Sequence, residues 1–435
     1  FALSLAGHTS GGPAKVAIIT SSMFGTVSGS AVANVMTTGT FTIPLMRRTG
    51  YRPAFSGAVE AVASTGGQLM PPIMGAAAFV MAEFLGTSFL TVATFAIFPA
   101  ILYFVAVFMA VHFEAKRIGL KGIPKPDLPR LGTVLRERGH LFLPLAIIIG
   151  VLLSGYSASF AALSGIVSVI PTTWLRSSTR YTFTPRAIIE TLEAGARNTI
   201  VVALACACAG IVIGTIILTG LGLAFTNLIM AASYNMLLPA LILTMIAGII
   251  LGMGLPTTPA YIMQVALLVP ALVRLGVQVE AAHLFVLYFA VLSAITPPVA
   301  ICCLVAAKIA QGSFFKTSFI AVRLGLPGFI LPFLFVVHPE ILGIDATFLE
   351  TVFVALLALL GVITINVIFE GYLLRPLHWI ERILLLPAGL GLIHPSLWAS
   401  IIGIGLLVFI AVRQWQANTR EAAERAQVSA GPAPS

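Results

Sequence analysis

The sequence predicts an all-α polytopic membrane protein that contains inverted repeats. Hydrophobic residues make up 59% of the 435 residues and charged residues only 9%, whereas a soluble domain carries about 25% charged residues. The mean hydropathy is +1.05, and the apolar stretches allow roughly ten full or partial passes of about 20 residues each. Two Pro-Pro pairs interrupt these stretches, and each follows a glycine-rich polar interruption at nearly the same distance.

These interruptions form two similar pairs. The first consists of residues 28–34, SGSAVAN, and 65–72, TGGQLMPP; the second consists of residues 252–259, GMGLPTTP, and 294–298, AITPP. Gly29 precedes Pro71 by 42 residues, and Gly254 precedes Pro297 by 43. Unpaired backbone groups cost several kcal/mol each in lipid. Broken segments at matching places in two halves therefore indicate the binding site of a secondary transporter.

The positions of Lys and Arg predict the orientation of the spans. The positive-inside rule places the basic segments in the cytoplasm, namely 47–52, 113–139, 176–197, 308–323, 375–382 and 413 onward. Residues 13–46 then start and end inside, and residues 238–273 start and end outside. Both segments are predicted to be re-entrant helical hairpins, one from each side, as an inverted repeat requires.

Four regions follow from this topology. Residues 1–112 form the first inverted repeat, with hairpin 13–46, broken helix 53–84 and a return helix. Residues 113–197 form a basic cytoplasmic loop, two helices and an amphipathic surface helix, 185–197. Residues 198–338 form the second inverted repeat, with a span at 198–218, hairpin 238–273 and broken helix 282–311. Residues 339–435 form a C-terminal membrane extension whose tail, from Asn418, is expected to be disordered.

The interruptions offer carbonyl and hydroxyl oxygens, which suit a hard cation such as sodium. The candidates for a first sodium site are Ser28, Gly29, Ser30, Asn34, Thr65 and Gly66. The candidates for a second site are Gly252, Gly254, Thr257, Thr258 and Thr296. An anionic substrate would lie between the tips, and its candidate ligands are Ser30, Asn34, Gln68 and Thr258. The structural alternative, that these residues only allow kinks and close packing, explains one such break better than four in two matched pairs.

Other charged residues receive a simpler interpretation. Glu60 and Glu83 flank the first broken helix, and although an intramembrane acid is a functional candidate, both are expected at solvated helix ends. Lys15 is expected to snorkel at the mouth of the first hairpin.

Nothing in the sequence indicates an enzyme. The cysteines, Cys206, Cys208, Cys302 and Cys303, are interpreted as small buried packing residues. There is no His-Cys-acid cluster with metal spacing, no phosphate-binding G-x-x-x-x-G-K-[ST] loop, and no base placed beside a serine. No basic patch with interleaved aromatic residues indicates nucleic-acid binding. Apart from sodium, no metal or cofactor is expected.

Several motifs resemble the large membrane subunit (DctM-like) of tripartite ATP-independent periplasmic (TRAP) transporters. They are Gly7-His8-x-x-Gly11-Gly12, the segment 24–33, Ile43-Pro44-x-Met46 with Gly50-Tyr51, and the segments 252–258 and 295–300. Residues 64–86 are similar to fused permeases, in which the small and large membrane subunits are one polypeptide. Residues 339–413 resemble the extra C-terminal helices of those fused permeases.

The resemblance implies a multi-pass permease of the bacterial inner membrane with an elevator-type motion. It implies sodium-driven uptake of small organic anions (dicarboxylate, 2-oxo acid or glutamate-like), delivered by a periplasmic substrate-binding protein of the TAXI type. The chain starts at Phe1 inside an apolar stretch, so small-subunit helices and the first large-subunit helices are expected to precede it. Two alternatives remain: a stand-alone sodium/anion symporter of the same hairpin architecture, and a passive channel.

Overall fold

The computed structural model describes residues 1–180, 184–394 and 396–429. In these residues the backbone forms helices and turns, and the only β-structure is one isolated bridge between Tyr372 and Pro376. Six helical segments of the described chain are long and apolar enough to cross a membrane: 89–117, 185–219, 257–274, 314–337, 348–370 and 397–420. The predicted all-α polytopic class is confirmed.

The first half consists of a helical hairpin followed by a broken helix. After the short α1 (Ala2–Ala6), the helices are α2 (Gly12–Ser28), α3 (Ala31–Arg48), α4 (Pro53–Gly66), the 3-10 turn η1 (Gly67–Leu69), α5 (Ala76–Leu85) and α6 (Phe89–Arg117). Gly29 ends α2 with φ +62°, a conformation that favours glycine. Ser30 then caps α3, since its Oγ accepts the amide of Ala33 at 3.3 Å. Hairpin geometry is thus encoded locally.

The second half repeats this arrangement in register. Its helices are α13 (Leu237–Gly252), α14 (Thr257–Arg274), α15 (Val279–Leu292), α16 (Ile301–Ala310), α17 (Phe314–Leu324) and α18 (Leu326–Val337). Both α3 and α14 have 18 residues, and both α4 and α15 have 14. Pro53 and Val279, which begin α4 and α15, both lie 18 residues before the first proline of their Pro-Pro pair. Both Pro-Pro bonds are cis.

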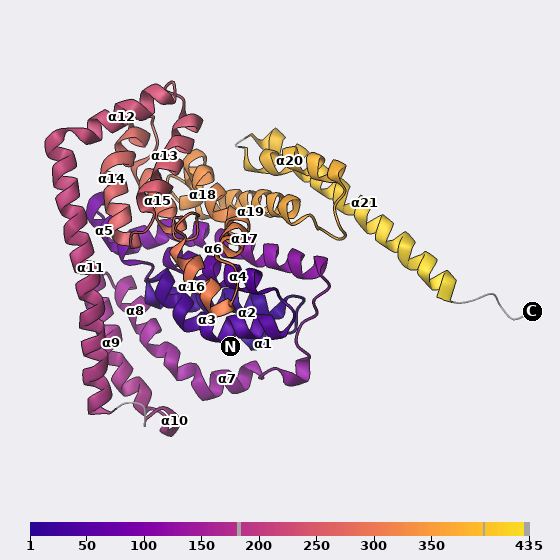
Figure 1. Cartoon of the computed structure of the whole chain (residues 1–435), viewed down its shortest axis with the longest axis horizontal. Helices are drawn as coiled ribbons and strands as arrows, with labels where there is room; N and C mark the ends of the chain where they lie inside the picture. The colour runs from indigo at the N-terminus through magenta and orange to yellow at the C-terminus, as the bar shows by residue number, and fades with distance from the viewer. Residues whose placement is uncertain (181–183, 395, 430–435) are drawn as a thin grey trace, which may run out of the picture.

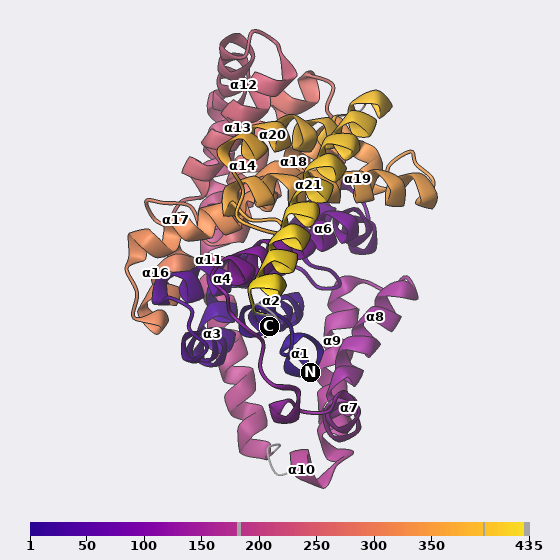
Figure 2. The same cartoon turned by 90° about the vertical axis from the view of Figure 1, so that its right-hand side faces the viewer.

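The middle of the chain joins the two halves. Its helices are α7 (Leu131–Arg138), α8 (Leu143–Leu153), α9 (Ala158–Trp174), α10 (Ser177–Arg180), α11 (Pro185–Thr219) and α12 (Leu221–Ala232), with short 3-10 turns at Lys125–Asp127 and Gly139–Phe142. Figure 1 shows α11 along one edge of the molecule, where it packs against α14. Figure 2 shows α7, α8 and α9 grouped beside the first-half helices.

Helix α11 corrects one expected boundary. The amphipathic segment 185–197 and the predicted span 198–218 are not separate elements, because a single helix runs through both. Two ion pairs of the i, i+4 type stabilise its first turns: Arg186 with Glu190 at 2.8 Å, and Glu193 with Arg197 at 2.7 Å. No proline follows Pro185 in this helix, so nothing in the backbone ends it at the membrane surface.

The C-terminal part also corrects an expectation. It contains a 3-10 turn at Pro339–Leu342, then α19 (Phe348–Glu370), α20 (Trp379–Ile393) and α21 (Leu397–Ser429). Helix α21 projects from the body in Figure 1 and continues through residues 418–429, which were expected to be disordered. The sequence there, NTREAAERAQVS, contains three Ala, two Glu and two Arg, all strong helix formers. The last six residues, 430–435, lie outside the described part of the chain.

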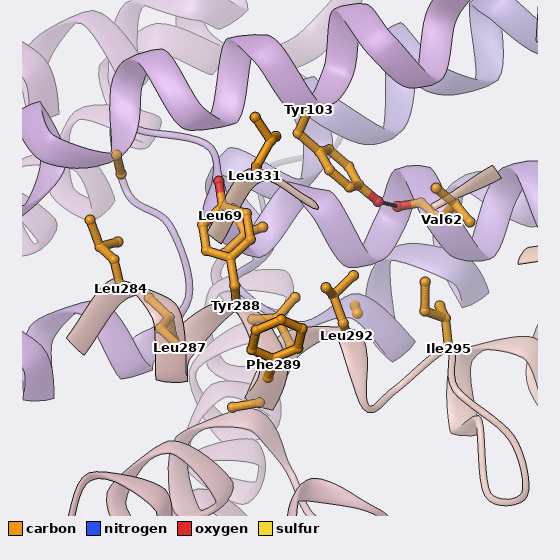
Figure 3. Packing of buried hydrophobic residues seen from close by; sticks show 14 of the residues in the cluster. Val62, Leu69, Tyr103, Leu284, Leu287, Tyr288, Phe289, Leu292, Ile295 and Leu331 are labelled. Carbon is orange, nitrogen blue, oxygen red and sulfur yellow. Dashed lines mark hydrogen bonds between the residues drawn. The ribbon is translucent and has the colours of Figure 1, made fainter. Parts of the chain in front are cut away.

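Helix α6 ties the broken helix of the first half to the second half. Figure 3 shows the phenol of Tyr103 pointing from α6 toward α4, where its hydroxyl donates to the carbonyl of Val62 at 2.9 Å. Tyr288, Leu292 and Leu331 pack in the same buried cluster. Because this hydrogen bond uses a backbone carbonyl inside a helix, it fixes α4 against α6 whatever side chain residue 62 carries.

Polar contacts attach the C-terminal helices to the rest. Asn366 on α19 donates to the carbonyl of Ala106 on α6 at 2.9 Å. Arg323 on α17 pairs with Glu370 on α19 at 3.2 Å. These contacts join three helices that are far apart in sequence, so α19 is part of the main body.

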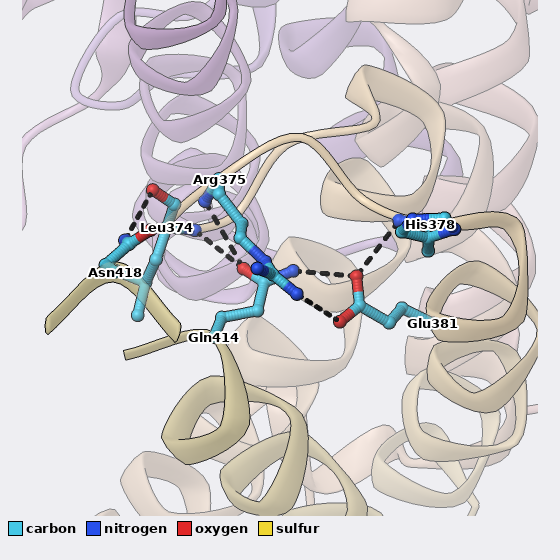
Figure 4. Close-up of polar contacts among 6 residues, drawn as sticks. All are labelled: Leu374, Arg375, His378, Glu381, Gln414 and Asn418. Carbon is cyan, nitrogen blue, oxygen red and sulfur yellow. Dashed lines mark hydrogen bonds and ion pairs between the residues drawn. The ribbon is translucent and has the colours of Figure 1, made fainter. Parts of the chain in front are cut away.

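A second polar cluster fixes the turn between α19 and α20 to α21. Glu381 is fully buried, and it accepts the backbone amide of His378 and the side-chain amide of Gln414, both at 3.0 Å (Figure 4). The carbonyl oxygen of Gln414 in turn accepts the amides of Leu374 and Arg375 at 3.1 and 3.3 Å. The Gln414 side chain therefore supplies a donor to the buried Glu381 and an acceptor to two backbone amides of the turn.

We predict that Gln414→Leu loosens this turn. Leaving buried polar groups without a partner costs about 1–3 kcal/mol. The thermal midpoint of the purified protein should fall, and the amides of residues 371–378 should exchange hydrogen faster. The matched control is Asn418→Ala, because Asn418 is half-buried and makes only a solvent-exposed hydrogen bond to the carbonyl of Leu374, at 3.3 Å. Its effect should be smaller, about 0.5 kcal/mol. Equal effects of both variants would contradict this account.

Candidate functional site

The two halves meet at a polar contact between the first broken helix and the second hairpin. The hydroxyl of Thr257 donates to Oε1 of Gln68 at 2.8 Å. Gln68 lies in the 3-10 turn after α4, and Thr257 is the first residue of α14. These residues are 189 positions apart. Two segments singled out as interruptions in the sequence are thus in direct contact.

The start of α14 exposes hydrogen-bond donors at this contact. The residue before it is Pro256, and no side chain caps the first turn. The amides of a helix N-terminus and its positive dipole end favour an anion. Thr258 is buried beside Thr257, so two hydroxyls and the free amides lie next to the carboxamide of Gln68.

The tip of the first hairpin lies against the loop that follows Pro71-Pro72. A Cβ on Gly29 would lie 3.1 Å from the carbonyl oxygen of Met74 and 3.5 Å from Cα of Gly75. Gly75 donates back to the carbonyl of Gln68 at 2.9 Å. Ser28 and Ser30 are at the same tip, with the Ser28 hydroxyl 3.4 Å from the carbonyl of Ser30. The tip, the loop and Gln68 are therefore connected.

The second hairpin makes the corresponding contact. Gly254 has φ +79°, and the nearest atom to a Cβ there is Cγ1 of Val299, at 3.9 Å, just after Pro297-Pro298. The carbonyl of Gly252 accepts the hydroxyl of Ser293 at 3.1 Å. Thr296 donates to the carbonyl of Leu292, in its own helix, at 2.8 Å. In both halves, a glycine with positive φ brings the hairpin tip close to the Pro-Pro break.

Three candidates of the first site lie away from the tip. Asn34 is buried between the hairpin arms, where its amide donates to the carbonyl of Ser21 at 2.8 Å. A Cβ on Gly66 would lie 2.1 Å from Cε1 of Tyr103, so Gly66 faces α6. The hydroxyl of Thr65 is buried without an oxygen or nitrogen partner and lies against the thiol of Cys302 on α16.

Glu60 lies in a different environment from the one expected. It is fully buried, near the middle of α4, and not at a solvated helix end. Hydroxyl groups from α2 and α3 surround it, because both hairpin arms pack against α4. Glu83, by contrast, is exposed as expected. The sequence does not predict the burial of Glu60, because hydropathy places this residue near a charged loop and does not show the hairpin that covers it.

Lys15 also departs from the expected position. Its side chain is buried rather than snorkelling. The ammonium lies 3.0 Å from Nδ1 of His112 and 3.1 Å from the hydroxyl of Thr9. It also lies 4.8 Å from the centroid of the Phe108 ring. The long helix α6 supplies two of these partners, so it covers the lysine.

Helical spacing could have identified the missed polar residues. Asn34, Thr38 and Thr42 recur every four residues, and Glu60 and Ser64 are separated by four. Residues four apart share a face of an α-helix. A polar stripe on an otherwise apolar helix in lipid indicates a partner that is also polar.

Comparisons with known proteins agree on a family. The protein-family model described as "Tripartite ATP-independent periplasmic transporter, DctM component" matches residues 1–350 of this chain. The chain is 26% identical over 342 residues to the sialic acid TRAP transporter large permease protein SiaM of Vibrio cholerae. The matched region covers 78% of each of the two chains.

Two further relatives match shorter regions. The C4-dicarboxylate TRAP transporter large permease protein DctM of Pseudomonas aeruginosa is 26% identical over 192 residues, 44% of each chain. The sialic acid TRAP transporter permease protein SiaT of Haemophilus influenzae is 31% identical over 156 residues, 36% of this chain and 25% of the relative.

Proposed function

Because the chain belongs to the DctM family of tripartite ATP-independent periplasmic transporters, we propose that it imports small organic anions by sodium symport. As a large permease of this family it is a multi-pass protein of the bacterial inner membrane, and it is not an enzyme. In this proposal, a periplasmic substrate-binding protein delivers the anion, and the two hairpins move with their broken helices as an elevator. The first and second repeats, 1–112 and 198–338, supply these moving parts.

The observation that carries this proposal is the contact between Gln68 and Thr257. It brings an uncapped helix N-terminus and a carboxamide together at one of the contacts between the two repeats. An incoming carboxylate would displace the hydroxyl from Gln68 and accept hydrogen bonds from the amides and from Thr258. Ser30 would reach the anion from the first tip.

This donor set supports a substrate that carries a carboxylate. The relatives are named for sialic acid and for C4-dicarboxylates, and both ligands carry carboxylate groups. We extend the carboxylate to this chain and expect a dicarboxylate, a 2-oxo acid or a glutamate-like anion. The delivering protein would be of the TAXI type.

Sodium would bind at the two glycine tips. Backbone carbonyls around Gly29 and Gly254, both in a left-handed conformation, provide the oxygen ligands that a hard cation prefers. The proposed sets are Ser28, Gly29 and Ser30 in the first half, and Gly252, Gly254, Thr257 and Thr296 in the second. Thr65 is omitted because its hydroxyl is buried against the thiol of Cys302. Asn34 and Gly66 are omitted because their packing, between the hairpin arms and against Tyr103, already accounts for them.

We predict uptake that requires both an inward sodium gradient and the binding protein. The full permease, with its small-subunit helices, is reconstituted in proteoliposomes with labelled 2-oxoglutarate, succinate or glutamate. Thr258→Ala and Ser30→Ala should each lower the initial rate about tenfold, which corresponds to about 1.4 kcal/mol. The control is Thr199→Ala, because this exposed hydroxyl on α11 binds only the carbonyl of Gly195, at 2.9 Å.

Each other outcome points to one alternative. Sodium-driven uptake without the binding protein would indicate a stand-alone symporter. Flux that ignores every imposed gradient would indicate a passive channel. Full activity of Thr258→Ala would contradict the placement of the anion at the start of α14.

A further inference from the structure

The carboxylate of Glu60 is surrounded by hydroxyl groups from three helices. Ser21 on α2 donates to it at 2.7 Å, Thr38 on α3 at 2.5 Å and Ser64 on α4 at 3.0 Å. Thr42 on α3 donates to its other oxygen, Oε2. The side chain is fully buried. We call these five residues the Glu60 cluster.

No basic side chain neutralises Glu60. None of the ion pairs in the described part of the chain includes it, and only hydroxyl groups interact with it. A buried ionised carboxylate without a cationic partner costs several kcal/mol. Buried acids in such surroundings bind a cation or a proton.

Among the described residues, none of the other titratable groups on the helices that pack against α4 forms a hydrogen bond or an ion pair with Glu60. Lys15 pairs with His112, Arg117 and Arg323 with Glu114 and Glu370, and His283 with Tyr261. Glu280 is half-buried at the start of α15, Tyr103 donates to the carbonyl of Val62, and Tyr288 is buried without a hydrogen-bond partner. The thiols Cys302 and Cys303 are buried. The remaining cationic side chains are exposed: Arg47, Arg48, Lys116, Lys308 and Lys316.

The Glu60 cluster can satisfy both the charged and the neutral acid. Each hydroxyl has one proton and two lone pairs. When Glu60 is ionised, all four hydroxyls donate to it. When Glu60 takes up a proton on Oε2, it donates to Thr42, whose hydroxyl turns to the carbonyl of Thr38, 3.0 Å away. One hydroxyl rotation therefore accommodates the proton, and no buried group loses its partner.

The second repeat shows that the fold does not require this cluster. Glu60 lies 11 residues before Pro71, and Val286 lies 11 residues before Pro297, in helices of equal length. By the same register, Ser64 corresponds to Ala290, and Thr42 corresponds to Leu268. Thr38 corresponds to the buried Gln264, whose side-chain amide donates to the carbonyl of Gly248 at 2.8 Å. The same hairpin and broken helix thus pack in the second half without an acid. The acid and its hydroxyls serve a purpose that packing does not explain.

We propose that Glu60 is a proton-binding site through which proton movement is coupled to substrate transport. The inference rests on the proposed transport function and adds a coupling ion to it. In each cycle, an O–H bond forms between a proton from water on the outer side and Oε2 of Glu60. The bond breaks after the hairpin has moved, and the proton passes to water on the inner side. Ser21 lies seven residues, about 10 Å along α2, before the tip, so hairpin movement changes the access of the Glu60 cluster to water.

The test uses the complete transporter with its binding protein in proteoliposomes. Sodium is equal on both sides, an inward proton gradient is imposed, and a trapped pH dye records the internal pH. For the unmodified protein, substrate should acidify the interior, and the proton gradient should accelerate uptake several-fold. Glu60→Gln keeps the shape and hydrogen bonds of the side chain, and it should lose both effects while it retains uptake driven by a sodium gradient. The control Glu83→Gln, at an exposed acid, should behave like the unmodified protein.

A second variant keeps the proposal testable if Glu60→Gln does not fold. Ser64→Ala removes one donor to the ionised carboxylate, so the ionised form is disfavoured. The pH at which proton stimulation is half-maximal should therefore rise, whereas a purely structural role for Ser64 would leave it unchanged.

Three results would contradict the proposal. The first is sodium-driven uptake by the unmodified protein without any acidification. The second is a Glu60→Gln variant that keeps the proton stimulation. The third is a Glu60→Gln variant that loses only its sodium dependence, since this would assign the Glu60 cluster to sodium. If the unmodified protein shows no uptake that depends on the binding protein, the transport function itself is wrong, and the coupling proposal falls with it.

Discussion

Gly25→Ala is expected to abolish uptake and to destabilise the protein. A Cβ at this position would lie 2.4 Å from Cα of Gly67 and 3.0 Å from its carbonyl carbon. Both are backbone atoms, so no flexible side chain can move aside. Gly25 lies on the first hairpin arm and Gly67 at the helix break, so the methyl group would separate these two elements. Overpacking of this kind costs about 1–3 kcal/mol, and the initial uptake rate should fall at least about tenfold.

The matched control for this substitution is Gly210→Ala. Gly210 lies within α11, and a Cβ there meets nothing within 4 Å. Alanine should stabilise the helix by up to about 1 kcal/mol at such a site and leave uptake unchanged. Thermal unfolding in detergent and initial uptake rates test both variants. Normal uptake by Gly25→Ala would show that the hairpin and the break need not touch during transport.

The second large effect is expected at the contact between Gln68 and Thr257. Gln68→Leu or Thr257→Val should each lower the initial uptake rate by about tenfold or more. Each change removes a side chain of the proposed substrate site (Gln68) or of the proposed sodium site (Thr257). It also leaves the partner, buried Gln68 or part-buried Thr257, without its hydrogen bond, at a cost of about 1–3 kcal/mol. If the two side chains act as one unit, the double variant should be little worse than either single variant. Initial rates at saturating and subsaturating substrate measure this coupling.

The control for this pair lies in the other hairpin. Thr37→Val removes an exposed hydroxyl on α3 that donates only to the carbonyl of Ala33, in its own helix, at 2.9 Å. It should leave the rate unchanged. Additive losses from Gln68→Leu and Thr257→Val would instead mean that the two side chains act separately.

The positions of the helices and of their breaks follow from the sequence because they depend on local chemistry. Gly29 and Gly254 adopt positive φ where the hairpins turn, and such turns favour glycine at little steric cost. Proline lacks a backbone donor, so neither α4, which ends at Gly66, nor α15, which ends at Leu292, continues through the Pro-Pro pair that follows it. These effects act within a few residues. The duplicated spacing therefore predicted two matching halves, and the structure has helices of equal length in register.

The predicted ends of two helices, α11 and α21, are wrong. The break expected within 185–218 and the disorder expected from Asn418 both gave way to continuous helix. In both segments the residues are good helix formers without an internal proline. Low hydropathy alone does not end a helix, so polar character was a poor guide to its boundaries.

Only the tertiary structure decided which polar residues meet. Ser21 and Thr38 lie 39 and 22 residues from Glu60 in sequence, and Gln68 lies 189 from Thr257. No local preference encodes such pairs, because they form when separate helices pack. The sequence by itself determined the helices, their breaks and the family, since these depend on backbone conformation, hydropathy and short motifs. The burial of Glu60 and the joining of the two repeats depend on side-chain contacts between distant segments, which exist only in the packed structure.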